Sequence, residues 1–123
     1  MIERGCLKPL INVTTLDLAV YEALNAVWKE RVVLKRIDEE TAKQLVRILE
    51  RIFKIIALDK VRDPNGIFEL ACKESITIYD ASYLYYALQN KLTLVTDDEK
   101  LLEKARQYIN VVKSRDLAQR YGC

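Results

Sequence analysis

The stretch TIYDASYLYYALQNKLTLVTDDEKLL, residues 77–102, contains the pattern that decides the fold expected for this chain. Apolar residues after Asp80 recur at helical spacing and predict a helix over residues 80–90. LTLVT, residues 92–96, is a short apolar run typical of a buried strand, and a second helical pattern covers residues 97–108. The stretch therefore predicts a helix, a buried strand and another helix, with acids where both helices begin.

The rest of the chain continues this alternation of short apolar strands and amphipathic helices. Asp38 is a good N-cap for the helix with the clearest apolar periodicity, and IIAL at its end fits either a last helical turn or a strand. Such alternation predicts a three-layer α/β/α fold with a short parallel sheet, in one domain over residues 1–123. The remaining expected elements are strands over residues 10–14 and 109–113, a helix over residues 16–31 capped by Thr14 or Thr15, and a helix over residues 65–74.

The composition excludes several kinds of active site. The chain has no histidine, which rules out Ser-His-Asp and Cys-His catalysis and histidine-ligated metals. Its three glycines are far apart, so a phosphate-binding glycine loop cannot form. Three cysteines without short spacing predict no zinc site and no disulfide framework, but reduced thiols in a cytoplasmic protein. No apolar run approaches the roughly 20 residues that span a bilayer, and the net charge is only +2.

The acids of the opening stretch have two competing interpretations. Thr96 to Glu99 reads as a capping box with Thr96 as N-cap, and Asp80 can be an N-cap itself. Ligands, however, gather at the carboxyl ends of parallel strands, which is where Thr96, Asp97 and Asp98 are expected. The local sequence leaves capping and metal binding open for these acids. For Glu22, within the helix predicted over residues 16–31, an exposed surface acid is the simpler interpretation.

Three motifs, taken in order along the chain, resemble the PIN-domain family and most closely its VapC-type ribonuclease toxins. The first is an acid on an early helix followed by asparagine, matched by Glu22 and Asn25. The second is Tyr-Asp-Ala at a helix start, matched by residues 79–81. The third is a strand ending in Thr-x-Asp, matched by Thr96 and Asp98. The resemblance covers nearly the whole chain from about residue 10 onward.

This resemblance implies a metal-dependent endoribonuclease. Members of the family hold Mg²⁺ or Mn²⁺ in a cluster of carboxylates, and all-oxygen sites suit these hard cations. Carried over residue by residue, Glu22, Asp80 and Asp98 form the metal cluster, and Thr96 positions water or a carboxylate through its hydroxyl. Asp97 falls at a variable position of the motif and is left as a helix-start acid. The resemblance also implies an RNA substrate and an antitoxin-like protein partner.

The N-terminus departs from the family pattern. PIN domains open with a strand that ends in Asp-Thr or Asp-Ser, whereas this chain opens MIERGCLKPLINVT. We therefore expect the family's first strand, its aspartate and the following helix to be absent, and activity to be impaired. A missing central strand leaves unpaired edges on its neighbours, so we expect a homodimer or larger assembly. Tyr83, Tyr85 and Tyr86 are candidate contacts in it, with ordinary core packing as the alternative.

Two other functions remain open from the sequence. The chain can be a catalytically inactive PIN-like module that binds RNA or an antitoxin-like protein. It can also be a phosphoacceptor of the receiver type, with Asp97 and Asp98 as the acid pocket and Asp59 as acceptor. Basic residues near residue 30 can contact phosphates or form a solvated helix end. The candidate substrate-binding residues are Asn25, Lys29 and Arg31, with Lys35 and Arg36 as further basic candidates.

Overall fold

The computed structural model describes residues 13–120, which form two compact units. The boundary between them in the sequence lies between Lys60 and Val61. We call residues 13–60 the N-terminal unit and residues 61–120 the C-terminal unit. Within residues 13–120, no helix is long and apolar enough to cross a membrane. The expected absence of the family's first strand concerns residues outside the described part of the chain. A single domain over residues 1–123 stays a prediction.

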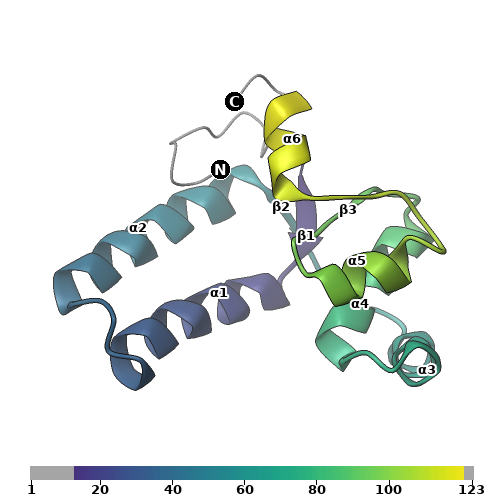
Figure 1. Ribbon diagram of the computed structural model, residues 1–123, viewed down its shortest axis with the longest axis horizontal. Helices are drawn as coiled ribbons and strands as arrows, with labels where there is room; N and C mark the ends of the chain where they lie inside the picture. The colour runs from purple at the N-terminus through teal and green to yellow at the C-terminus, as the bar shows by residue number, and fades with distance from the viewer. Residues whose placement is uncertain (1–12, 121–123) are drawn as a thin grey trace. The chain divides into compact units, whose positions relative to one another are not determined.

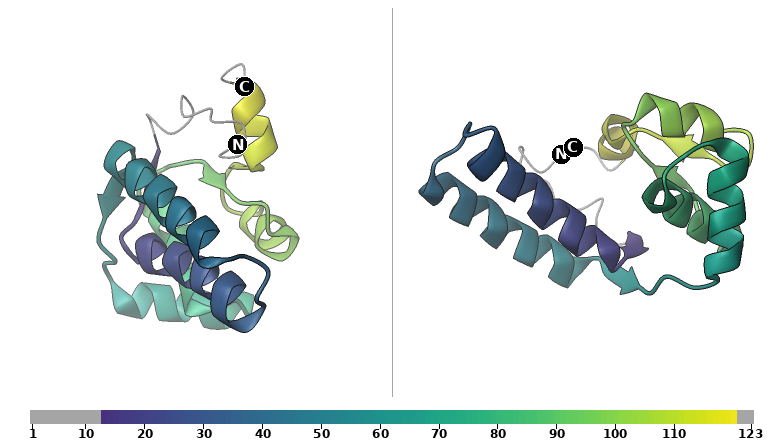
Figure 2. Two further views of the ribbon diagram at one scale, coloured as in Figure 1. Left: turned by 90° about the vertical axis from the view of Figure 1, so that its left-hand side faces the viewer. Right: turned by 90° about the horizontal axis from the view of Figure 1, so that it is seen from below.

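The N-terminal unit consists of a helical hairpin and a two-stranded parallel sheet. Figures 1 and 2 show α1 and α2 running side by side, and residues of the two helices are in contact. In the sheet, Thr14 lies opposite Ala57 and Leu16 lies opposite Asp59. The elements of this unit are β1 (Thr14–Leu16), α1 (Leu18–Trp28), the π-helix η3 (Lys29–Val33), α2 (Glu39–Ile55) and β2 (Ala57–Asp59).

The first strand and helix of this unit lie later in the sequence than predicted. The strand expected over residues 10–14 begins outside the described residues, and the structure places Thr14 and Thr15 inside β1. These threonines therefore do not cap the helix, because strand pairing takes them and β-branched residues suit a paired strand. Asp17 stands at the N-cap of α1 without a side-chain capping hydrogen bond. No residue of α1 is buried, so the predicted core face of the helix is at most half-buried.

The second helix confirms the clearest prediction from the sequence. The Asp38 carboxylate accepts a hydrogen bond from the amide of Thr41 at 2.8 Å, so Asp38 is the N-cap of α2. The helix ends at Ile55, and β2 follows after one residue. Of the two alternatives for IIAL, a strand begins within this segment because Ala57 pairs with Thr14 in the sheet.

The C-terminal unit contains four helices and a second parallel sheet. Leu94 of β3 lies opposite Val111 of β4, and Val95 lies opposite Val112. Each strand has two residues, fewer than predicted, and the helix predicted over residues 97–108 is shorter. The final helix was not predicted, because its sequence lacks apolar periodicity. The elements are α3 (Pro64–Glu74), α4 (Ile78–Gln89), β3 (Leu94–Val95), α5 (Glu99–Ala105), β4 (Val111–Val112) and α6 (Ser114–Arg120).

The core of the C-terminal unit lies where α3, α4 and α5 meet. Leu70, Leu84, Leu101 and Ala105 form one buried cluster, with Leu84 and Ala105 completely buried. A second buried cluster joins α3 to α4 through Ile67, Ala71 and Ala81. Because the first cluster draws one or more residues from each of three helices, it fixes their packing within this unit.

A polar contact that the sequence did not predict fixes the start of α3. Asp63 caps this helix by accepting from the amide of Gly66 at 3.2 Å, and it also accepts a hydrogen bond from the Tyr85 hydroxyl on α4. A Cβ atom at position 66 would lie 2.5 Å from the Tyr85 hydroxyl oxygen and 2.7 Å from the Asp63 carboxylate. Only glycine leaves room for this contact.

Low pH should reduce the stability of the C-terminal unit, because Asp63 becomes protonated. The hydrogen bond from Tyr85, and then that from Gly66, lowers the pKa of Asp63 below its ordinary value. A lowered folded-state pKa means that the stabilisation is present above the unfolded pKa of about 3.9 and is lost as the pH falls through the folded pKa. Asp63→Asn should therefore flatten the fall of the urea midpoint below about pH 4.

Tyr85→Phe tests the same hydrogen bond from its donor side, because it removes the hydroxyl and keeps the ring. It should also flatten the acid dependence, and the double variant should flatten it little more than Asp63→Asn does. A wild-type slope in Asp63→Asn would show that this carboxylate has no part in acid unfolding.

Candidate active site

The candidate site begins at the carboxyl end of β3. The Thr96 amide donates to the Val112 carbonyl at 3.0 Å and so extends the pairing of β3 with β4 by one residue. Asp97 and Asp98 follow at once, before α5 begins at Glu99. These acids therefore lie at the position where ligands gather in parallel sheets, as predicted.

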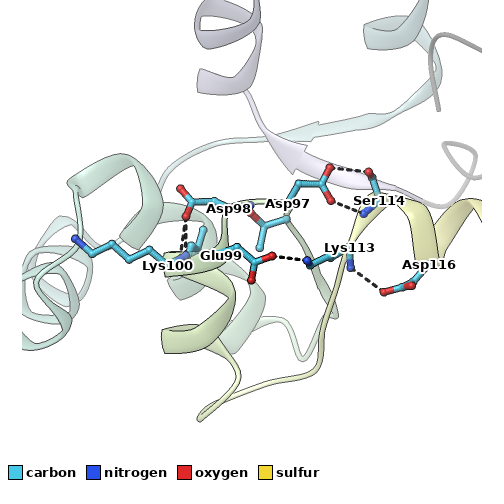
Figure 3. Close-up of polar contacts among 9 residues, drawn as sticks. Asp97, Asp98, Glu99, Lys100, Lys113, Ser114 and Asp116 are labelled. Atoms are coloured by element: carbon cyan, nitrogen blue, oxygen red, sulfur yellow. Dashed lines mark hydrogen bonds and ion pairs between the residues drawn. The ribbon is translucent and has the colours of Figure 1, made fainter.

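Asp98 is the N-cap of α5. One carboxylate oxygen, Oδ1, accepts hydrogen bonds from the amides of Lys100 at 2.9 Å and Leu101 at 3.2 Å (Figure 3). The prediction that Thr96 caps this helix is wrong by two residues. The Thr96 hydroxyl instead accepts from the Asp98 amide at 3.2 Å. Aspartate and threonine are both good N-caps. Asp98 takes this role because the strand hydrogen bond of Thr96 keeps Thr96 in the sheet.

Capping leaves half of the Asp98 carboxylate available. Both capping hydrogen bonds end on Oδ1, and within residues 13–120 no hydrogen bond is made to Oδ2. Asp98 is exposed, so this oxygen is accessible to a cation. Capping of α5 through Oδ1 therefore does not prevent Asp98 from binding a cation through Oδ2.

Asp97 has a different role from the one predicted. It was expected to be a helix-start acid of α5, but its carboxylate binds the first residue of α6. Oδ1 accepts from the Ser114 amide at 2.9 Å and Oδ2 accepts from the Ser114 hydroxyl at 2.6 Å (Figure 3). These hydrogen bonds, with a smaller contribution from the Lys113 ammonium, lower the pKa of Asp97. The contact joins residues 17 apart in sequence, which is why local patterns could not show it.

Asp80 lies in the first turn of α4 and is not its N-cap. Thr77 is the N-cap, and its hydroxyl accepts from the Asp80 amide at 3.1 Å. The helix begins three residues earlier than the Asp80 cap predicted, because Thr77 supplies the first capping oxygen. The Asp80 side chain is half-buried. Acids in the first turn favour the helix dipole, and the carboxylate is not used as the cap acceptor.

Asp80 and Asp98 are each followed by a leucine of the same buried cluster. Leu84 lies one turn after Asp80 on α4, and Leu101 lies one turn after Asp98 on α5. Residues one turn apart share a helix face, so the two acids extend from helix ends whose next turns pack into one core.

The other predicted site residues lie in the N-terminal unit. Glu22 and Asn25 are exposed on α1, and Lys29 and Arg31 are exposed on η3. Of the further basic candidates, Arg36 forms an ion pair with Glu30 at 2.6 Å. Within residues 13–120 there is no group of three or more Asp, Glu or Cys side chains that could hold a metal ion. The joint site of Glu22 with the acids of the C-terminal unit stays a prediction.

Comparison with known proteins identifies the family. The sequence model of the PIN domain matches residues 2–107. The chain belongs to the PIN domain family. Its PIN domain is 38% identical to Exonuclease VapC9 from Pyrobaculum aerophilum over 98 residues, which are 78% of this chain and 69% of that protein. It is also 38% identical to Ribonuclease VapC3 from the same organism over 92 residues, which are 73% of this chain and 69% of that protein.

The fold of this PIN domain also has a solved counterpart. The crystal structure of PAE2754 from Pyrobaculum aerophilum matches with a TM-score of 0.77 and 29% sequence identity. The match covers 89% of this chain and 76% of that one. The VapC-type PIN family and the three-layer α/β/α PIN-like fold class, both predicted from the sequence, are therefore confirmed.

Proposed function

We propose that this chain is a divalent-metal-dependent endoribonuclease of the VapC type, with Glu22, Asp80 and Asp98 as metal ligands. The observation that carries the proposal is the Asp98 carboxylate, which caps α5 with one oxygen and leaves the other accessible at the end of β3. The VapC names of two relatives that are 38% identical support a nuclease.

The residues fit the metal that the family implies. Carboxylate oxygens suit Mg²⁺ and Mn²⁺, and the sequence offers no histidine that would favour a softer metal. Such a cation, when bound, polarises the phosphodiester and makes water more acidic, so hydrolysis proceeds without a histidine base. The backbone at Asp80 and Asp98 is well anchored, because each residue lies in or directly before a first helical turn that a buried leucine follows.

The other proposed residues bind or orient groups around the carboxylates. The Thr96 hydroxyl holds the Asp98 amide and so helps to fix the backbone of a metal ligand. Asn25, Lys29 and Arg31 are proposed to contact the RNA, because Lys29 and Arg31 are exposed cations that can neutralise phosphates. Binding through them should weaken as salt rises.

Asp80→Asn tests the proposal through the chemistry of one ligand. The substitution keeps the size of the side chain and removes its charge, so Mg²⁺- or Mn²⁺-dependent cleavage of a mixed RNA should fall at least about 100-fold, more than loss of an outer-shell partner. EDTA should abolish wild-type cleavage. Glu103→Gln is the matched control, since it removes one exposed acid from α5 outside the proposed ligand set. Equal cleavage by Asp80→Asn and wild type would contradict the assignment.

The same measurement separates the alternative function. If the wild-type chain binds RNA or an antitoxin-like protein in the presence of metal but releases no cleavage product, it is an inactive binding module. Binding unaffected by EDTA would then place the contact away from the carboxylates.

We also propose that the chain acts in the cytoplasm as a homodimer with an antitoxin-like partner. Tyr83, Tyr85 and Tyr86 are half-buried on α4, and Tyr85 is already engaged with Asp63 in its own chain. All three tyrosines stay candidates for intermolecular contacts. Light scattering on a size-exclusion column should give about twice the 14.3 kDa of one chain. A cooperatively melting monomer at micromolar concentration would contradict the dimer.

A further inference from the structure

Two segments of the C-terminal unit are tied together around Asp98. Figure 3 shows the segment after β3 facing the segment after β4. The Thr96 amide donates to the Val112 carbonyl, both Asp97 oxygens bind Ser114, and the Lys113 ammonium pairs with Glu99. The residue before Asp98 and the residue after it are thus both anchored to the same neighbouring segment.

Both carboxylate oxygens of Asp97 are engaged by a single residue. Both of its oxygens accept hydrogen bonds from Ser114, at 2.9 Å from the amide and 2.6 Å from the hydroxyl. Hydrogen bonds to an ionised carboxylate are roughly twice as strong as neutral ones, and a two-point contact also fixes the plane of the carboxylate. The contact therefore acts as a clamp between the two segments, which we call the Asp97–Ser114 clamp.

Sheet hydrogen bonds in this region are few. β3 and β4 have two residues each, and the ladder ends with the hydrogen bond from Thr96 to Val112. The capping hydrogen bonds fix Oδ1 of Asp98 relative to α5 but do not fix α5 relative to the sheet. Leu94 of β3 and Val111 of β4 pack against the buried cluster that contains Leu101 and Ala105, so apolar contacts hold α5 near the sheet. The clamp and the ion pair between Lys113 and Glu99 add polar restraints directly beside Asp98.

We propose that Asp97 and Ser114 are positioning residues, which hold the free oxygen of Asp98 in the orientation that binds the divalent cation. The assignment rests on the proposed function, because it takes Asp98 as a metal ligand. Neither residue touches the cation or the RNA in this assignment. They act by fixing the backbone on which the ligand stands, as outer-shell partners fix ligands at other metal sites.

Ser114→Ala is the sharpest test, because it removes one clamp hydrogen bond without changing the charge near the site. Titration with Mn²⁺ alone, followed by calorimetry, should show about tenfold weaker binding with unchanged stoichiometry. Ser114→Thr keeps the hydroxyl and should restore most of the affinity. Gln119→Ala, an exposed neutral change later in α6, should bind Mn²⁺ like wild type. Asp98→Asn should weaken binding more than Ser114→Ala does.

Amide hydrogen exchange in the metal-free protein supplies a second measurement. Ser114→Ala should speed exchange at Lys100 and Leu101, whose amides are held by Asp98, several-fold, and leave α3 unchanged. Wild-type Mn²⁺ affinity together with wild-type exchange in Ser114→Ala would overturn the proposal. Uniformly faster exchange in every helix would also overturn it, because that is a loss of global stability rather than of positioning.

Failure of the proposed function would look different. In that case wild type and Asp98→Asn would bind Mn²⁺ equally, so Asp98 is not a metal ligand, and that result overturns the positioning of a ligand as well. If Asp98→Asn weakens Mn²⁺ binding but Ser114→Ala does not, the proposed ligand stands and the clamp has no positioning role.

Discussion

Asp98→Asn is expected to lower RNA cleavage at least about 100-fold while α5 stays folded. Asparagine is as good an N-cap as aspartate, so its side-chain oxygen can still accept from the amides of Lys100 and Leu101. The substitution removes the negative charge that Asp98 would supply to a cation as the proposed ligand. The helix loses only the favourable interaction of that charge with its dipole, about 0.3–1 kcal/mol.

Asp98→Ala separates the two roles of this residue. It removes both the cap and the proposed ligand, so it should lose cleavage to the same extent as Asp98→Asn and also lose about 1 kcal/mol of stability. Cleavage rates with Mg²⁺ and thermal melts followed by circular dichroism measure the two effects independently. If Asp98→Asn cleaves RNA like wild type, capping is the whole role of this residue. Glu103→Gln again controls for the loss of an acid from α5.

The sequence predicted correctly that Asp97 and Asp98 follow a short strand, but it could not assign their hydrogen bonds. A short apolar strand followed by acids predicted the site, because ligands gather where parallel strands end. Thr96, Asp97, Asp98 and Glu99 include several residues that can cap a helix, and single-residue preferences differ too little to choose among them. The choice depends on β4 and Ser114, which engage Thr96 and Asp97 from elsewhere in the chain.

The same contrast holds for the helices. The start of α2 was predicted correctly, because a strong cap at Asp38 precedes a long and regular apolar pattern. The start of α4 was predicted three residues late, because Thr77 and Asp80 both suit a helix start and the apolar pattern does not distinguish them. Short strands have the weakest signals, since two-residue pairing in β3 and β4 is decided by the partner strand.

Leu84→Ala is expected to cost about 2–5 kcal/mol of the free energy of unfolding, the largest stability effect predicted for the C-terminal unit. Leu84 is completely buried and shares its cluster with Leu70 of α3 and Leu101 of α5. Truncation removes contacts to more than one helix at once, and neighbours held in separate helices cannot all collapse into the cavity. Small domains have only about 5–15 kcal/mol of stability, so a large fraction is at stake.

Urea denaturation measures this loss as a lower midpoint at an unchanged slope. Ile78→Ala on the same helix is the matched control, because Ile78 is 46% exposed and lies outside the buried cluster. It should cost much less than Leu84→Ala, and equal costs would mean that the cluster does not dominate stability. Because Leu84 lies one turn after Asp80 and Leu101 one turn after Asp98, Leu84→Ala should also weaken Mn²⁺ binding under conditions where the variant is still folded. Unchanged Mn²⁺ affinity in the folded variant would show that the first turns of α4 and α5 keep their carboxylates in place without this core contact.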